Sequence, residues 1–336
     1  MPGSTSAHPQ RPLVAVFCIL VGVFCISLND MLIKHLSTDL PLHQIVFVRS
    51  AIGIAFSLVI LQFEGGLRAL RTGRSGLLAL RGLLLVAANL TYFAALAALP
   101  LADATALFFA APLFITLLAV PFLGERVGPR RLIAVLVGLV GVIAMLRPGA
   151  AAQAAPDRLI LLLPVVAALA YAGVQILTRF LAAAAPASVL AIHIQLSFLA
   201  MGALFWAVAG DGRFAQDIDN PSLQFLLRAW VWPEPAATAL LALIGGLSAI
   251  VAYTLSQAYR LGDAALVAPF EYIALPLAIL WGWLIFAELP GLWVWLGAAL
   301  IAGSGAFVFW REAQISRAAR VQAPKTQDVP TRLPRR

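Results

Sequence analysis

A few charged side chains stand inside otherwise apolar stretches of the sequence. Asp30 and Lys34 are one helical turn apart, Arg49 lies in the following stretch, and Glu271 lies in the second half. If these stretches cross a bilayer, each charge costs roughly 2.5–3.5 kcal/mol to insert, so each is a candidate functional group. Asp30 could pair with Lys34 or Arg49 as a structural clamp, or these groups could hold a substrate or a coupling proton.

Prolines interrupt two of the apolar stretches. Glu271 lies between Pro269 and Pro276, and Pro112 interrupts a stretch in the first half. Because proline removes a backbone donor, it breaks or kinks a helix. A broken membrane helix with a carboxylate at the break is typical of a binding site, although a kink held by a structural hydrogen bond has the same residues.

Uncharged polar side chains also fall inside the apolar stretches. Such groups on several helices can line one cavity, but singly they more often hydrogen-bond between helices. The candidates are Asn29, Asn89, Tyr92, Tyr171, Gln175, His193, Tyr253 and Gln257, with Tyr272 next to Glu271 on a different helical face.

Three further assignments have competing interpretations. Phe108 and Phe109 could stack with Tyr92 on a flat ring, or they could simply pack in the core. His193 could carry protons because its charge changes near neutral pH, or it could also be a packing residue. Arg81 lies one turn into its stretch, where its long side chain can extend to the cytoplasmic headgroups.

The composition requires lipid around the chain. Of its 336 residues, 62% are hydrophobic and 11% are charged, and the mean hydropathy is +0.94. Apolar runs of about 20 residues, long enough to span a bilayer as helices, recur almost from end to end. We therefore predict an all-α polytopic membrane protein with about ten helices, near 13–36, 43–62, 76–99, 103–124, 130–147, 159–182, 187–210, 237–259, 263–287 and 291–310.

The basic residues predict an orientation. The net charge is +8, but Lys and Arg gather at the N-terminus, in alternate loops and in the tail, as in cytoplasmic segments of membrane proteins. This pattern places both termini in the cytoplasm and does not indicate nucleic-acid binding. The segment 211–236 is predicted to be a long loop with an interfacial aromatic part on the membrane surface.

The two halves of the sequence resemble each other. Ala98-Leu-Pro-Leu-Ala-Asp103 and Leu-Gly-Glu125 in the first half correspond to Ala258-Tyr-Arg-Leu-Gly-Asp263 and Ala287-Glu288 in the second. Each half has five predicted helices, an odd number, so the second is inverted relative to the first. The predicted organisation is a cytoplasmic segment 1–12, a first repeat 13–147, a linker 148–158, a second repeat 159–310 and a basic cytoplasmic tail 311–336.

These residues resemble the drug/metabolite transporter superfamily, in particular its ten-helix EamA-type permeases. The resemblance rests on Asn29-Asp30-Met-Leu-Ile-Lys34, Phe47-Val-Arg49, Arg81-Gly82, Pro112 with Leu-Gly-Glu125, and Ala268-Pro269-Phe-Glu271-Tyr272. Within the superfamily the chain looks like the bacterial branch of S-adenosylmethionine uptake proteins and riboflavin transporters. The resemblance implies an uptake permease of the bacterial inner membrane.

We therefore expect a secondary transporter that moves a small organic metabolite by alternating access, with riboflavin or an S-adenosylmethionine-like compound as candidates. An exporter of amino acids or drugs is the alternative. An intramembrane enzyme would need clustered nucleophiles or metal ligands, and the sequence has neither HExxH nor a P-loop. The expected partners are the solute, the bilayer and either a coupling proton or an exchanged metabolite, and no cofactor or metal is expected.

Overall fold

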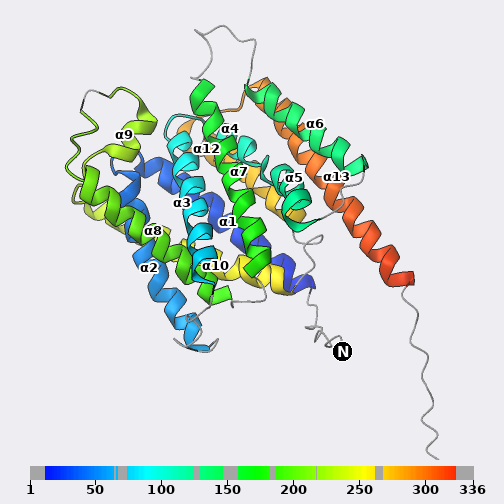
Figure 1. Cartoon of the computed structure of the whole chain (residues 1–336). Helices are drawn as coiled ribbons and strands as arrows, with labels where there is room; N and C mark the ends of the chain where they lie inside the picture. Colours follow the sequence, from blue (N-terminus) through cyan, green and yellow to red (C-terminus); the bar gives the residue numbers. More distant parts are fainter. Residues whose placement is uncertain are drawn as a thin grey trace, which may run out of the picture.

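The computed structural model describes residues 12–63, 66, 74–124, 129–146, 158–181, 187–216, 218–261 and 268–322. All regular structure in these ranges is helical (Figure 1). The elements are α1 (Pro12–Leu36), α2 (Leu42–Phe63), α3 (Ser75–Leu96), α4 (Leu101–Phe108), α5 (Ala111–Leu123), α6 (Pro129–Leu146), α7 (Arg158–Leu181), α8 (Ala187–Ala209), α9 (Pro221–Leu227), α10 (Pro235–Leu261), the 3-10 helix η2 (Ala268–Ile273), α12 (Ala274–Phe286) and α13 (Leu292–Gln322).

The helices are those of a multi-pass membrane protein. Seven helical stretches among the described residues are long and apolar enough to cross a membrane, and α4 and α5 together make one of them. Three shorter apolar helices cover Leu132–Met145, Phe270–Phe286 and Leu292–Phe307. The prediction of an all-α polytopic membrane protein is confirmed at this level.

Two predicted boundaries need correction. The stretch 103–124 is two helices, α4 and α5, because the chain leaves the helix at Phe109 and Ala110. The last helix does not end near 310, since α13 continues to Gln322. Its extension is rich in Ala, Arg and Gln, which favour helix in water as well as in lipid. The first part of the predicted tail is therefore helical.

The long helices pack in pairs. α1 lies against α10, α3 against α7, α2 against α8, and α6 against α13. Figure 1 shows α6 and α13 together at one edge of the bundle, α2 and α8 toward the other, and α3 and α7 between them. The largest core forms where these pairs meet.

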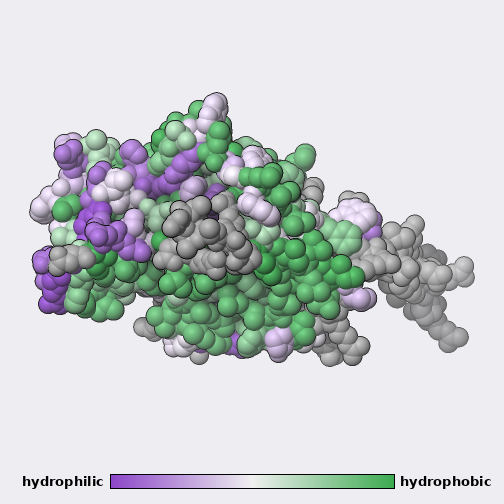
Figure 2. Space-filling view, turned by 90° about the horizontal axis from the view of Figure 1, so that it is seen from above, coloured by the Kyte–Doolittle hydropathy of each residue, from purple (hydrophilic) through white to green (hydrophobic). Residues whose placement is uncertain are grey.

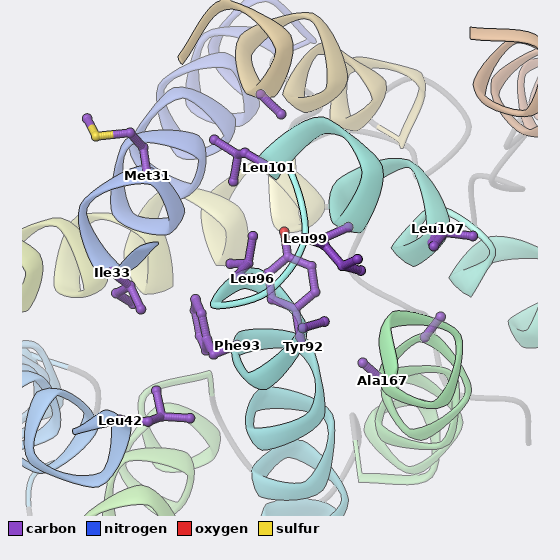
Figure 3. Close-up of a cluster of buried hydrophobic side chains, with 14 of the residues drawn as sticks. Met31, Ile33, Leu42, Tyr92, Phe93, Leu96, Leu99, Leu101, Leu107 and Ala167 are labelled. Atoms are coloured by element: carbon purple, nitrogen blue, oxygen red, sulfur yellow. The ribbon is translucent and has the colours of Figure 1, made fainter. Parts of the chain in front are cut away.

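This core lies toward one end of the bundle, which we call the Lys34 end. It holds the end of α1, the start of α2, and the turn between α3 and α4. Figure 3 shows Phe93, Leu96, Leu99 and Leu101 clustered around that turn. α4 is buried along its length up to Leu107, whereas α5 exposes much of its surface.

The outer surface is apolar. Phe17, Phe56, Leu83, Leu204 and Trp293 are all more than half exposed, which suits contact with lipid chains rather than water. Figure 2 views the molecule from above: hydrophilic residues gather on one side, and hydrophobic residues cover most of the rest.

The segment between α8 and α10 is tied to the Lys34 end. The Gln44 amide donates to the Val231 carbonyl at 2.7 Å and accepts from the Val231 N–H at 3.2 Å. Arg228 donates to the Ser37 and Thr38 carbonyls. The segment was predicted as a loop, and the structure adds the short helix α9 and this anchor to α2.

Candidate functional site

An ion pair closes the Lys34 end of the bundle. Lys34 Nζ lies 3.0 and 2.9 Å from the two carboxylate oxygens of Glu288 and donates to the Leu99 carbonyl at 2.6 Å. Glu288 also accepts from the Leu101 N–H at 3.3 Å, at the start of α4. We call Lys34, Leu99, Leu101 and Glu288 the clasp. It joins α1, the α3–α4 turn and the α12–α13 turn.

Ala287, which has a left-handed backbone conformation, positions Glu288 in the clasp. Ala287 caps α12 with φ of 53°, and it is the non-glycine residue with positive φ in the described part of the chain. Gly124 caps α5 in the same way with φ of 68°. The sequence suggested that Lys34 could pair with Asp30, but its partner is Glu288. The turn that follows α12 places the Glu288 carboxylate next to Lys34, which lies near the end of α1.

Asp30 instead joins a hydrogen-bond chain across three helices. Its Oδ2 accepts from the Tyr92 hydroxyl at 3.1 Å, and the Tyr92 and Thr105 hydroxyls lie 3.2 Å apart. Thr105 in turn donates to the Leu101 carbonyl at 2.8 Å. The chain therefore connects α1 and α3 to α4, and through Leu101 to the clasp.

Arg49 on α2 faces the same region. Its guanidinium lies over the Phe93 ring at 5.8 Å and the Phe198 ring at 5.2 Å, and Nη2 donates to the Asn89 side-chain oxygen at 3.3 Å. Arg49 and Asp30 interact electrostatically, but no ion pair within 4.0 Å links these two described residues. Two aromatic rings and the Asn89 side chain thus hold the Arg49 guanidinium near Asp30, although the two charged groups do not form an ion pair.

Aromatic rings surround the break between α4 and α5. The Phe108 ring lies 5.1 Å from Tyr92 and 5.4 Å from Tyr171 on α7, and Phe109 lies 5.1 Å from Tyr272. Pro112 falls in the first turn of α5, where no backbone donor is needed. The predicted break is present, and rings from α3, α4, α7, η2 and the break itself pack together around it.

Glu271 lies in the second broken helix. It sits in the 3-10 helix η2 with Pro269, and Pro276 falls in the first turn of α12. Glu271 is close enough to Tyr171 to interact with it electrostatically, and Gln175 lies one turn further along α7, partly buried. The predicted interruption of this helix is thus present, and it brings the acid toward the aromatic groups.

Four other predicted candidates lie outside the networks described above. Asn29 accepts from Ser248 on α10 at 3.5 Å, and the His193 ring contacts the Val189 carbonyl of its own helix. Tyr253 is 47% exposed. Gln257 is partly buried near the end of α10.

Arg81 also differs from its prediction. It is buried, and its Nε donates to the Thr178 hydroxyl on α7 at 2.8 Å. Because a neighbouring helix supplies an acceptor, the side chain does not need to reach a headgroup. Arg81 is therefore an interhelical contact between α3 and α7.

Sequence reasoning missed several members of these networks. Glu288 served only as a marker of the repeat, and Thr105, Phe93 and Phe198 were not singled out. A charged residue at the end of an apolar stretch was the available signal for Glu288. No group of three or more metal-binding side chains occurs among the described residues.

Comparisons with known proteins agree with this architecture. Residues 13–147 match the EamA-like transporter family. A riboflavin transporter of Rhizobium johnstonii is 30% identical over 321 residues, covering 94% of this chain and 97% of that protein. An S-adenosylmethionine uptake transporter of Rickettsia prowazekii is 28% identical over 295 residues, covering 87% and 91%.

A solved crystal structure shares the fold. It is 22% identical in sequence and aligns with 90% of this chain and 98% of its own at a TM-score of 0.61. The family match and the relatives that align over most of the chain show that the chain belongs to the EamA-like transporter family of the drug/metabolite transporter superfamily. It is a permease for a small metabolite rather than an enzyme.

Proposed function

We propose that this protein takes up a flat, ring-bearing metabolite, with riboflavin as the first candidate. The observation that carries the proposal is the aromatic set at the helix breaks, Tyr92, Phe108, Phe109, Tyr171 and Tyr272. These rings pack against one another with tilted planes, and a planar ligand could stack on the faces that they leave partly accessible. Full-length relatives named riboflavin transporters support the same substrate.

The fold of this permease consists of two inverted five-helix repeats. The helix pairs support this arrangement: α1 against α10 corresponds to α7 against α3, while α2–α8 and α6–α13 each pair an element with its own counterpart. Pro112 and Pro276 open the second part of each broken helix, and Gly124 and Ala287 close it with a left-handed residue. Such repeats place the site at their interface.

The transport cycle is alternating access across the bacterial inner membrane, with both termini cytoplasmic. In that orientation the Lys34 end faces the periplasm. The clasp and the dense core beneath it support a state closed to that side. Release of Lys34 from Glu288 would open it. Glu271 is our candidate for contact with the solute or a coupling proton.

Uptake in cells tests the substrate. A bacterial host that cannot make or import riboflavin should grow on low riboflavin and accumulate the labelled vitamin when it expresses this chain. Excess unlabelled riboflavin should compete, and S-adenosylmethionine should not. No uptake with normal amounts of protein in the membrane would refute the substrate, and uptake of S-adenosylmethionine would replace it. Faster loss of label from preloaded cells would instead indicate an exporter.

A matched pair of tyrosines tests the aromatic set. Tyr171→Ala removes a ring that contacts Phe108, so KM for riboflavin should rise about five- to ten-fold. Tyr253→Ala removes an exposed ring on α10 and should leave KM within about two-fold. Equal effects of the two changes would show that the rings at the break do not bind the solute.

A further inference from the structure

We infer that Asp30 and Arg49 together recognise the imide edge of a planar heterocycle, with Asp30 accepting from the ring N–H and Arg49 donating to a neighbouring carbonyl. This inference rests on the proposed substrate class and assigns the residues that select it. The two side chains come from α1 and α2 and meet beside the aromatic set.

The first step is the unused bonding capacity of Asp30. Its Oδ2 accepts from Tyr92, and Tyr92 is held in turn by Thr105. Among the described residues, Oδ1 has no hydrogen-bond partner, and it is not fully enclosed. Asp30 is partly exposed although it lies deep in an apolar helix. A fixed carboxylate therefore keeps one acceptor oxygen that no described group occupies.

Arg49 has unused donors in the same part of the bundle, because it packs over Phe93, whose ring lies 5.4 Å from that of Tyr92. Only 6% of the residue is exposed, and Nη2 makes its one hydrogen bond to a described residue, Asn89. Nε and Nη1 have no partner in the described part of the chain and are not fully enclosed. The rings of Phe93 and Phe198 keep the guanidinium in place. A buried cation with free donors in a rigid position is prepared for an acceptor.

The charges define the ligand group. Asp30 and Arg49 interact electrostatically without an ion pair within 4.0 Å, so neither side chain uses up the hydrogen-bonding capacity of the other. Together they are neutral. A ligand group with net charge would leave an uncompensated charge in the membrane interior, whereas a neutral group with a donor beside an acceptor matches both.

The neighbouring rings select a heterocycle among such groups. Tyr92 bonds directly to Asp30, and its ring lies 5.1 Å from Phe108, which contacts Tyr171. A stacked ring therefore points its edge at the acid and the cation. The isoalloxazine ring of riboflavin has an imide N–H between two carbonyls on one edge, which is the required pattern.

Binding of two flavins to the purified full chain tests the inference. Riboflavin and 3-methylriboflavin differ in the imide N–H, and riboflavin fluorescence reports binding. The unaltered protein should bind the methylated compound about 10- to 100-fold more weakly, since a hydrogen bond to a charged group is lost. Asp30→Ala should reduce this ratio to near 1. Asn29→Ala, a change on the neighbouring residue that contacts Ser248, should keep the ratio.

The outcomes separate the inference from the proposed function. Failure of the unaltered protein to bind either flavin overturns the substrate and the inference with it. Equal binding of both flavins by the unaltered protein overturns the inference alone and needs no variant. If Asp30→Ala still binds riboflavin more tightly than 3-methylriboflavin by the same ratio, the inference is also overturned, because the methyl group would then weaken binding through residues other than Asp30.

Discussion

The clasp makes a quantitative prediction because its two charges have unequal surroundings. The side chain of Lys34 is 9% exposed and that of Glu288 is 30% exposed. Glu288→Gln removes the counter-charge and leaves a buried ammonium with only neutral acceptors, the Leu99 carbonyl and the new amide oxygen, and we expect a cost of about 2–3 kcal/mol to the closed state. Lys34→Met leaves a carboxylate that water can reach and that still accepts from Leu101, so we expect about 1 kcal/mol.

Opening of the Lys34 end is the quantity to measure. Ala104 on α4 is fully buried at this end, so Ala104→Cys is shielded while the clasp is closed. Cys18 and Cys25 are replaced first, and an impermeant thiol reagent is added to intact cells. While the open state stays minor, the labelling rate follows its population. Glu288→Gln should speed labelling about 30- to 150-fold and Lys34→Met about five-fold.

The double variant decides whether the two residues act together. Lys34→Met with Glu288→Gln removes both charges, so its effect should fall below the sum of the single effects by at least about 1 kcal/mol. Strictly additive effects, or a larger effect of Lys34→Met than of Glu288→Gln, would refute the reasoning.

An exposed ion pair in the same chain is the matched control. Asp211 lies 3.8 Å from Arg213, and their side chains are 61% and 58% exposed. Because water and salt screen such a pair, Asp211→Asn should change the labelling rate by less than about two-fold.

Two further predictions concern the backbone and the topology. Ala287→Gly relieves the strain of a positive φ at the α12 cap and should stabilise the purified protein by about 0.5–1 kcal/mol, seen as a higher apparent melting temperature. An unchanged or lower melting temperature would mean that the backbone strain at Ala287 is small or that the fold depends on it. Arg213→Cys should react with an impermeant reagent from outside intact cells, while a cysteine beyond Gln322 should react only after lysis, and the opposite result would reverse the topology.

The lengths of the apolar runs were enough to predict most of the fold. Membrane helices need about 20 apolar residues, and this requirement placed the long helices close to their observed bounds. The composition was less informative about the residues at which helices end. Charges after Trp310 suggested the end of the helix, but charged residues do not by themselves end a helix, and α13 continues to Gln322. Pro112 predicted a break, while its position at Phe109 and Ala110 required the structure.

The site was harder to predict because helices in lipid are apolar on every side. Asn29 and Asp30 are adjacent, and the sequence does not indicate which of them faces the interior. The structure turns Asn29 toward Ser248 and Asp30 toward Tyr92. No hydrophobic periodicity marks which face of α1 is interior, so only packing decides. The pairing of Lys34 with Glu288 spans almost the whole chain and depends on how the halves fit together.

The short helix α4 connects the two functional regions. Leu101 at its start belongs to the clasp, the Thr105 hydroxyl lies 3.2 Å from that of Tyr92, and Phe108 at its end contacts Tyr92 and Tyr171. Because α4 is buried up to Leu107 and spans only about 10 Å, we expect it to move as a rigid unit. A ligand that stacks on Phe108 and bonds to Asp30 therefore contacts the element that supports the clasp. If binding shifts α4, it changes the fit of Leu101 to Glu288, so occupancy of the site and closure at the Lys34 end are expected to be linked.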